Sequence, residues 1–127
     1  MKIDLIVRSI CCLRPGVEAV SENIRVVSLV GRFLEHARIF AFSDGDDEKM
    51  YLGSADLMQR NLNRRVETAF PLREKRHREK VRRLLDLQFA DNANGWELGP
   101  DGTFERLHPK EDEEPVDSQA ILLGEGF

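Results

Sequence analysis

The sequence predicts a single α/β domain, in which a mixed β-sheet is flanked by helices. Short runs rich in β-branched residues recur through the first half of the chain, and the apolar residues change to a helical spacing after residue 73. The length of 127 residues, of which 41% are hydrophobic, is sufficient for one modest core and too short for two ordinary domains. We expect one domain over residues 1–108, followed by an acidic linker and tail over residues 109–127.

Five segments in the first half have the composition of strands. Pro15 and Gly16 mark a loop, the polar run from Ser43 to Glu48 marks a turn, and Pro71 ends the last strand. We expect all five strands in one mixed sheet. They cover residues 3–7, 24–30, 39–42, 50–56 and 66–70.

The most clearly periodic segment covers residues 73–91 and predicts an amphipathic helix that packs on the sheet. One face of this helix carries Val81, Leu84, Leu85, Gln88 and Phe89. The stretch over residues 75–83 is basic, but acidic residues interrupt it. We therefore interpret it as a solvated helix face and expect no nucleic-acid partner.

Turn signals and charge organise the remainder of the chain. Gly95, Gly99 and the pair Asp101-Gly102 predict a short hairpin over residues 96–106. A charged linker over residues 110–114 follows, then a short helix over residues 118–123, and we expect the last residues to be disordered.

Composition limits the class of protein. No apolar run approaches the roughly 20 residues of a membrane-spanning helix, and the start does not have the pattern of a signal peptide. We predict a cytoplasmic protein and leave open whether a full-length form associates with membranes. The adjacent pair Cys11-Cys12 does not have the spacing of a zinc or redox motif and is interpreted as two reduced core thiols.

Charge differs between the two halves of the chain. Residues 1–83 carry 17 Lys and Arg against 12 Asp and Glu, a net charge of +5, whereas residues 84–127 carry 2 against 11, a net charge of −9. The basic excess suits an anionic ligand. A strand only two residues after the initial methionine is unusual for a complete domain, so we expect the chain to be part of a longer protein.

The chemically informative residues are His36 and Arg38, followed by Gly53-Ser54-Ala55-Asp56. A histidine beside a cation suits phosphoryl chemistry, because the histidine can act as nucleophile or acid and the cation offsets charge on the phosphoryl oxygens. The pattern resembles the phospholipase D superfamily, which uses His-x-Lys, an Asp and Gly-Ser-x-Asn. Arg38 replaces the Lys, Asp56 replaces the Asn, and the spacing between the two motifs is longer.

Ordered blocks from Lys2 to about Arg106 resemble one family, the polyphosphate kinases that synthesise long chains, in their carboxy-terminal phospholipase-D-like domain. The blocks are residues 3–8, 10–16, 21–26, 30–39, 53–56 and 60–67. Two positions depart from the family pattern. Ser9 stands where Gly is usual, and Leu57 stands where Trp usually follows the Ser-Ala-Asp.

The resemblance implies reversible transfer of the terminal phosphoryl group of ATP to polyphosphate, with Mg²⁺, through a phosphohistidine formed in a preceding domain. By position, His36 is the second active-site histidine, which contacts phosphate and acts as an acid. Arg8 binds the ATP phosphates, and Arg65 is a weaker candidate for the same role. Arg38 and Asp56 support the site. No metal ligand is assigned in this chain, because Mg²⁺ is expected to be bound outside it.

The implied partners are ATP or ADP, polyphosphate and the remainder of the kinase chain, which is expected to form a homo-oligomer. Two alternatives stay open: a homodimeric phosphodiesterase or nuclease of the phospholipase D type, and a non-catalytic phosphate-binding module. Asp56 would orient His36 or Arg65, or cap its own loop. His77 and His108 are interpreted as exposed residues without function.

Overall fold

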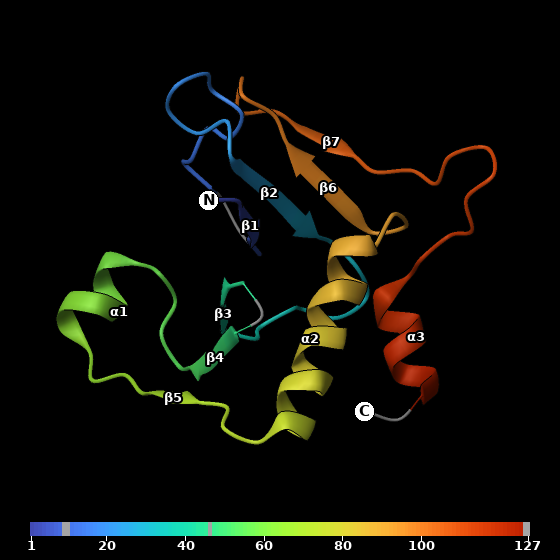
Figure 1. Cartoon of the computed structure of the whole chain (residues 1–127). Coiled ribbons are helices and arrows are strands. Elements are labelled where there is room, and N and C mark those ends of the chain that lie inside the picture. Colours follow the sequence, from blue (N-terminus) through green and yellow to red (C-terminus); the bar gives the residue numbers. More distant parts are fainter. Residues whose placement is uncertain (9–10, 46, 126–127) are drawn as a thin grey trace. The chain divides into compact units, whose positions relative to one another are not determined.

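The computed structural model describes residues 1–8, 11–45 and 47–125. The chain contains both helices and strands, as predicted for an α/β protein, and its first four elements are all strands (Figure 1). In chain order the elements are β1 (Ile3–Ile6), β2 (Ile24–Leu29), β3 (Ile39–Asp44), β4 (Asp47–Gly53), α1 (Gln59–Arg64), β5 (Ala69–Pro71), α2 (Lys75–Ala90), β6 (Gly95–Leu98), β7 (Phe104–Arg106) and α3 (Ser118–Glu125).

The chain divides into two compact units. Unit 1 combines residues 1–35 with residues 84–127, and unit 2 consists of residues 36–83. The boundary expected at residue 108 stays a prediction. The segment beyond it contains α3, which agrees with the short helix predicted from residue 118 onward.

Unit 1 contains a mixed sheet with the order β1-β2-β6-β7. β1 and β2 run parallel, and the other neighbouring pairs run antiparallel. The inner strand β2 is buried on both faces, with Val26 and Val27 fully covered and Leu29 nearly so. The adjacent Val26 and Val27 are both buried, which fits this position, because consecutive residues of a strand point to opposite faces of the sheet.

Unit 2 contains a sheet with the order β3-β4-β5, antiparallel throughout. Asp44 pairs with Asp47, so β3 and β4 form a tight hairpin. Gly45 in its loop has a φ of 62°, a left-handed conformation that glycine adopts at little cost. Among the described residues of this unit, Met50 on β4 is the buried apolar side chain, with 1% exposure.

The α/β class with a mixed sheet is confirmed, but the expectation that all five predicted strands share one sheet was wrong. β1 and β2 lie in one sheet, and β3, β4 and β5 lie in the other. Both edges of β2 are taken, one by β1 and the other by β6 from the later hairpin. β3 therefore pairs with β4, its neighbour in sequence, as consecutive strands usually do.

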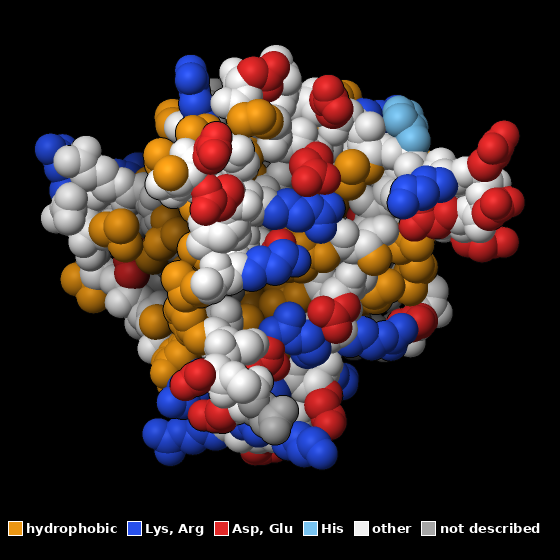
Figure 2. Space-filling model, turned by 45° about the horizontal axis from the view of Figure 1, so that its top comes forward, with side chains coloured by type: hydrophobic (Ala, Val, Ile, Leu, Met, Phe, Trp, Pro, Cys, Tyr) orange, Lys and Arg blue, Asp and Glu red, His pale blue; other side chains and the backbone are white. Residues whose placement is uncertain are grey.

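The predicted helix over residues 73–91 is confirmed as α2, and the predicted hairpin as β6 and β7. Gln88 is buried, and Val81, Leu84, Leu85 and Phe89 are partly buried. In the view of Figure 2 basic and acidic side chains are interspersed, and α2 itself carries the ion pair Lys75–Glu79. Among the described residues, no helix combines the length and the apolar composition needed to cross a membrane.

Candidate active site

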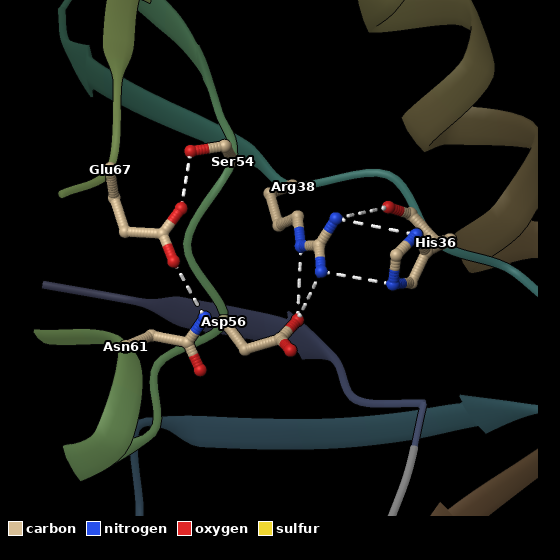
Figure 3. Close-up of polar contacts among 6 residues, drawn as sticks. All are labelled: His36, Arg38, Ser54, Asp56, Asn61 and Glu67. Atoms are coloured by element: carbon tan, nitrogen blue, oxygen red, sulfur yellow. Dashed lines mark hydrogen bonds and ion pairs between the residues drawn. The ribbon is translucent and has the colours of Figure 1, made fainter. Parts of the chain in front are cut away.

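The guanidinium of Arg38 is the centre of the candidate site in unit 2 (Figure 3). Its Nε donates to Asp56 Oδ1 at 3.0 Å, and its Nη2 lies 2.9 Å from the same oxygen. The side chains of Arg38 and Asp56 keep 21% and 24% of their exposure. This ion pair is therefore shielded from bulk water but still accessible to a ligand.

The adjacent edge of the Arg38 guanidinium, formed by Nη1 and Nη2, lies against the imidazole of His36 (Figure 3). Nη2 is 2.9 Å from His36 Nε2, and Nη1 is 3.3 Å from Nδ1. Arginine has only donors, and a neutral imidazole has one acceptor nitrogen, so at most one of these contacts is a hydrogen bond. The geometry places a fixed cation and a proton-carrying ring within reach of one anionic group.

Local chain geometry holds these residues together. His36 and Arg38 lie in the segment that leads into β3, and Asp56 lies in the loop that follows β4. Antiparallel pairing of β3 with β4 brings the two segments together, and Gly53 N donates to Arg38 O at 3.0 Å. Asp56 thus contacts Arg38, which in turn contacts His36, and its role among the three alternatives stays a prediction.

A second polar network fixes the loop that carries Asp56 (Figure 3). Ser54 Oγ donates to Glu67 Oε2 at 2.5 Å, and Asn61 Nδ2 donates to Glu67 Oε1 at 2.8 Å. These hydrogen bonds lower the pKa of the Glu67 carboxyl below its ordinary value; partial burial opposes this shift, and the charges of Arg65 and Arg38 add to it. Arg65 and Arg38 are thus in electrostatic range of one carboxylate.

The predicted site residues are distributed between the two units. Unit 2 brings His36, Arg38 and Asp56 together, and Arg65, which lies in the same unit, lowers the pKa of the Glu67 carboxyl through its charge. Arg8 is an exposed residue of unit 1, just after β1, and its membership of a phosphate site stays a prediction. His77 and His108 are exposed, as expected.

A Mg²⁺ site is a separate question. Among the residues that the structure describes, no group of three or more His, Cys, Asp or Glu side chains could hold a metal ion. Asp56 is held by Arg38, and Glu67 is held by Ser54 and Asn61. The donors present do not fit a Mg²⁺ site, so no step below is assigned to a metal in this chain.

Sequence reasoning missed several residues of these networks. Glu67 and Asn61 lie inside one of the blocks that carried the family resemblance, but they have no distinctive local pattern. The short helix α1, which carries Asn61, was also missed because the segment is polar and has no apolar periodicity. Of the two departures, Leu57 is 74% exposed, and Ser9 lies outside the described residues.

Comparison with known proteins finds the same family that the sequence resembles. Residues 1–119 match the family model described as polyphosphate kinase C-terminal domain 2. The chain is 52% identical to a polyphosphate kinase of Synechocystis sp. over its whole length, which is 17% of that protein. It is 50% identical to a polyphosphate kinase of Pseudomonas aeruginosa, covering 97% of this chain and 18% of that protein.

A solved structure is similar as well. The crystal structure of polyphosphate kinase from Porphyromonas gingivalis matches with a TM-score of 0.89 and 41% identity, covering 95% of this chain and 18% of that one. The chain thus spans less than a fifth of the length of these relatives. The expected α/β, phospholipase-D-like fold is the fold that the chain shares with this structure.

Proposed function

The chain belongs to the polyphosphate kinase C-terminal domain 2 family, and we propose that it forms the carboxy-terminal catalytic part of a polyphosphate kinase. The reaction is reversible transfer of the terminal phosphoryl group of ATP to polyphosphate. In the forward direction a histidine in a preceding domain takes the phosphoryl group and ADP leaves. A terminal oxygen of polyphosphate then attacks the phosphorus as the bond from nitrogen to phosphorus breaks.

The observation that carries this proposal is the contact of His36 with an Arg38 guanidinium that Asp56 holds. Phosphoryl transfer needs fixed cations and hydrogen-bond donors at oxygens that carry charge, much more than it needs new covalent chemistry. Arg38 supplies a charged planar fork that matches phosphate oxygens. Protonated His36 has no acceptor nitrogen for Arg38, so as the acid it supplies an N–H to a phosphoryl oxygen in place of that contact.

Two further arginines complete the proposed phosphate contacts. Arg8 binds the ATP phosphates, and Arg65 contributes more weakly, as the family resemblance implies. Both are exposed, and a guanidinium offers phosphate oxygens two parallel donors. Mg²⁺ supports the reaction from outside this chain, bound to the substrate phosphates or to the remainder of the enzyme.

The proposed partners follow from the same assignment. They are ATP or ADP, polyphosphate and the rest of the kinase chain, which we propose to be a homo-oligomer. The cytoplasm is the proposed location, because ATP is available there.

Incubation with labelled ATP and Mg²⁺ tests the division of roles. We expect the full-length enzyme to make polyphosphate and to carry label on a histidine outside this chain. The 127-residue chain alone should make none, because transfer through a phosphohistidine needs the absent nucleophile. Synthesis by the chain alone, or stable labelling of His36, would show that the two histidines are assigned wrongly.

The same experiment addresses the alternatives. A phosphodiesterase of the phospholipase D type would hydrolyse a phosphodiester as a homodimer, and its motif would place Lys at position 38 and Asn at position 56. Here Arg38 and Asp56 form an ion pair with each other. Diester hydrolysis by the chain alone would favour that alternative, and ATP binding without turnover in the full-length enzyme would favour a binding module.

A further inference from the structure

The carboxamide of Gln119, on α3, is bound to the backbone of the segment that precedes His36. Phe33 N donates to Gln119 Oε1 at 2.9 Å, and Gln119 Nε2 donates to Phe33 O at 2.8 Å. A side-chain amide that pairs with both backbone groups of one residue acts like a neighbouring strand and fixes that residue's orientation.

The same amide and a second one bind Glu35, the residue immediately before His36. Gln119 Nε2 donates to Glu35 Oε1 at 2.7 Å, and Gln88 Nε2, from α2, donates to Glu35 Oε2 at 2.9 Å. Gln88 and Gln119 are 4% and 7% exposed. Each carboxylate oxygen of Glu35 therefore has a neutral donor on a buried side chain, and charge-assisted bonds of this kind are the stronger ones.

The position of Gln119 is itself fixed. Ser118, the preceding residue, is fully buried and donates to Asp91 Oδ2 from its backbone N at 2.9 Å and from Oγ at 2.6 Å. Gly31 makes room for the amide, because a Cβ at that position would lie 2.5 Å from Gln119 Oε1. With its oxygen and nitrogen both bound, this amide has little freedom to move aside.

We propose that Gln119 and Gln88 are positioning residues for His36, acting through Phe33 and Glu35. This inference rests on the proposed function, because it assumes that His36 takes part in phosphoryl transfer. Glu35 is joined to His36 by a peptide bond, so fixing Glu35 restricts the backbone of His36. Small displacements of a reacting group such as His36 can lower a rate strongly. Under this proposal, the segment over residues 109–127, interpreted from the sequence as linker and tail, contributes to turnover through Gln119.

Steady-state kinetics of the full-length enzyme test the proposal. We expect Gln119→Ala to lower kcat about 10-fold with little change in the KM for ATP, because alignment is lost and ground-state binding is not. Leu123→Ala is the matched control, since this residue lies on the same helix and is 63% exposed. Gly31→Ala should reproduce the effect of Gln119→Ala by displacing the amide.

Two further measurements separate positioning from general stabilisation. In a His36→Ala background, Gln119→Ala should cause no further loss of turnover, because residues that act through one another are not additive. Gln119→Glu should lower kcat more than Gln119→Ala, since it sets two carboxylates against each other. Adding Glu35→Gln to Gln119→Glu should restore part of the rate, because the new amide at position 35 can donate to the new carboxylate.

The outcomes distinguish this inference from the function on which it rests. A His36→Ala enzyme with normal turnover contradicts the proposed function and the inference with it. An impaired His36→Ala enzyme together with a normal Gln119→Ala enzyme contradicts the inference alone. Equal losses from Gln119→Ala with and without His36 also overturn it, since the residue would then act on the whole fold. Circular dichroism and thermal melting of each variant show whether it is folded.

Discussion

Two polar clusters, one in each unit, use an aspartate in opposite ways. In the Arg38 cluster (His36, Arg38 and Asp56), Asp56 holds a cation and both side chains keep about a fifth to a quarter of their exposure. In the Asp91 cluster (Asp91, Ala93, Asn94 and Ser118), the carboxylate is 1% exposed and accepts hydrogen bonds from neutral donors alone among the contacts described.

The difference indicates which cluster can act on a ligand. Burial raises the pKa of the Asp91 carboxyl, but hydrogen bonds from Ser118, Asn94 and Ala93 outweigh it, so this pKa lies below its ordinary value. The Asp91 cluster is satisfied internally and joins the end of α2 to the start of α3. The Arg38 cluster offers a cation and an imidazole to an incoming anion.

A large effect that would sharpen this comparison is expected at Arg38. Arg38→Ala in the full-length enzyme should lower kcat roughly 100-fold, because a fixed donor to the transferring group is lost. Arg38→Lys should restore only part of the rate, since an ammonium returns the charge without the planar fork. Steady-state rates measure both effects, with Arg76→Ala, an exposed arginine of α2, as control. Near-normal turnover of Arg38→Ala would mean that this cluster is structural too.

A smaller effect on binding is expected at Arg8. Arg8→Ala should raise the KM for ATP about 10-fold, because a charged hydrogen bond to a bound phosphate is lost in the ground state. Arg8→Lys should recover part of it. Initial rates over a range of ATP concentrations measure the change. An unaltered KM in the Arg8→Ala enzyme would remove this residue from the phosphate contacts.

The Asp91 cluster should act chiefly on stability and should lower kcat no more than Gln119→Ala does, because it reaches His36 only through Ser118 and Gln119. Asp91→Asn should lower the free energy of unfolding by about 2 kcal/mol, because the amide cannot accept all of these hydrogen bonds. Chemical denaturation of the chain followed by circular dichroism measures this, with the exposed Asp112→Asn as control. A loss of kcat in the folded Asp91→Asn enzyme that exceeds the loss in Gln119→Ala would contradict the division between the two clusters.

The pH dependence of stability tests the role of Asp91 in a second way. Because the pKa of Asp91 is lower in the folded protein, its contribution to stability is complete above the ordinary value of 3.8 and is lost as the pH falls through the lowered pKa. The wild-type chain should therefore lose stability below about pH 4. The Asp91→Asn chain should lack this part of the loss, and identical acid sensitivity in the two chains would contradict the assignment.

Local patterns predicted much of the fold from the sequence. Runs of β-branched residues located β1 and β2, the helical spacing located α2, and glycine turns located the β6–β7 hairpin. The division into two sheets was not predictable from these patterns, because it depends on β6 taking the second edge of β2. Strand pairing over a long sequence separation leaves no local signal.

The candidate site was partly predictable for a similar reason. His36, Arg38 and Asp56 have ionisable side chains in a recognisable order, and the structure brings them together. The buried amides of Gln88 and Gln119 are ordinary polar residues in sequence, and only the folded chain shows that both bind Glu35. Gln88 did give one signal, since it falls on the otherwise apolar face of α2.

The turnover of the His36→Ala enzyme, compared with that of His108→Ala, tests the central claim most directly. Both histidines are exposed, so the pair separates a role in the reaction from the loss of any surface imidazole. With circular dichroism to confirm folding, we predict that His36→Ala lowers kcat about 100-fold or more, with a smaller change in the KM for ATP, and that His108→Ala leaves both unchanged. Near-normal turnover of a folded His36→Ala enzyme would contradict the account.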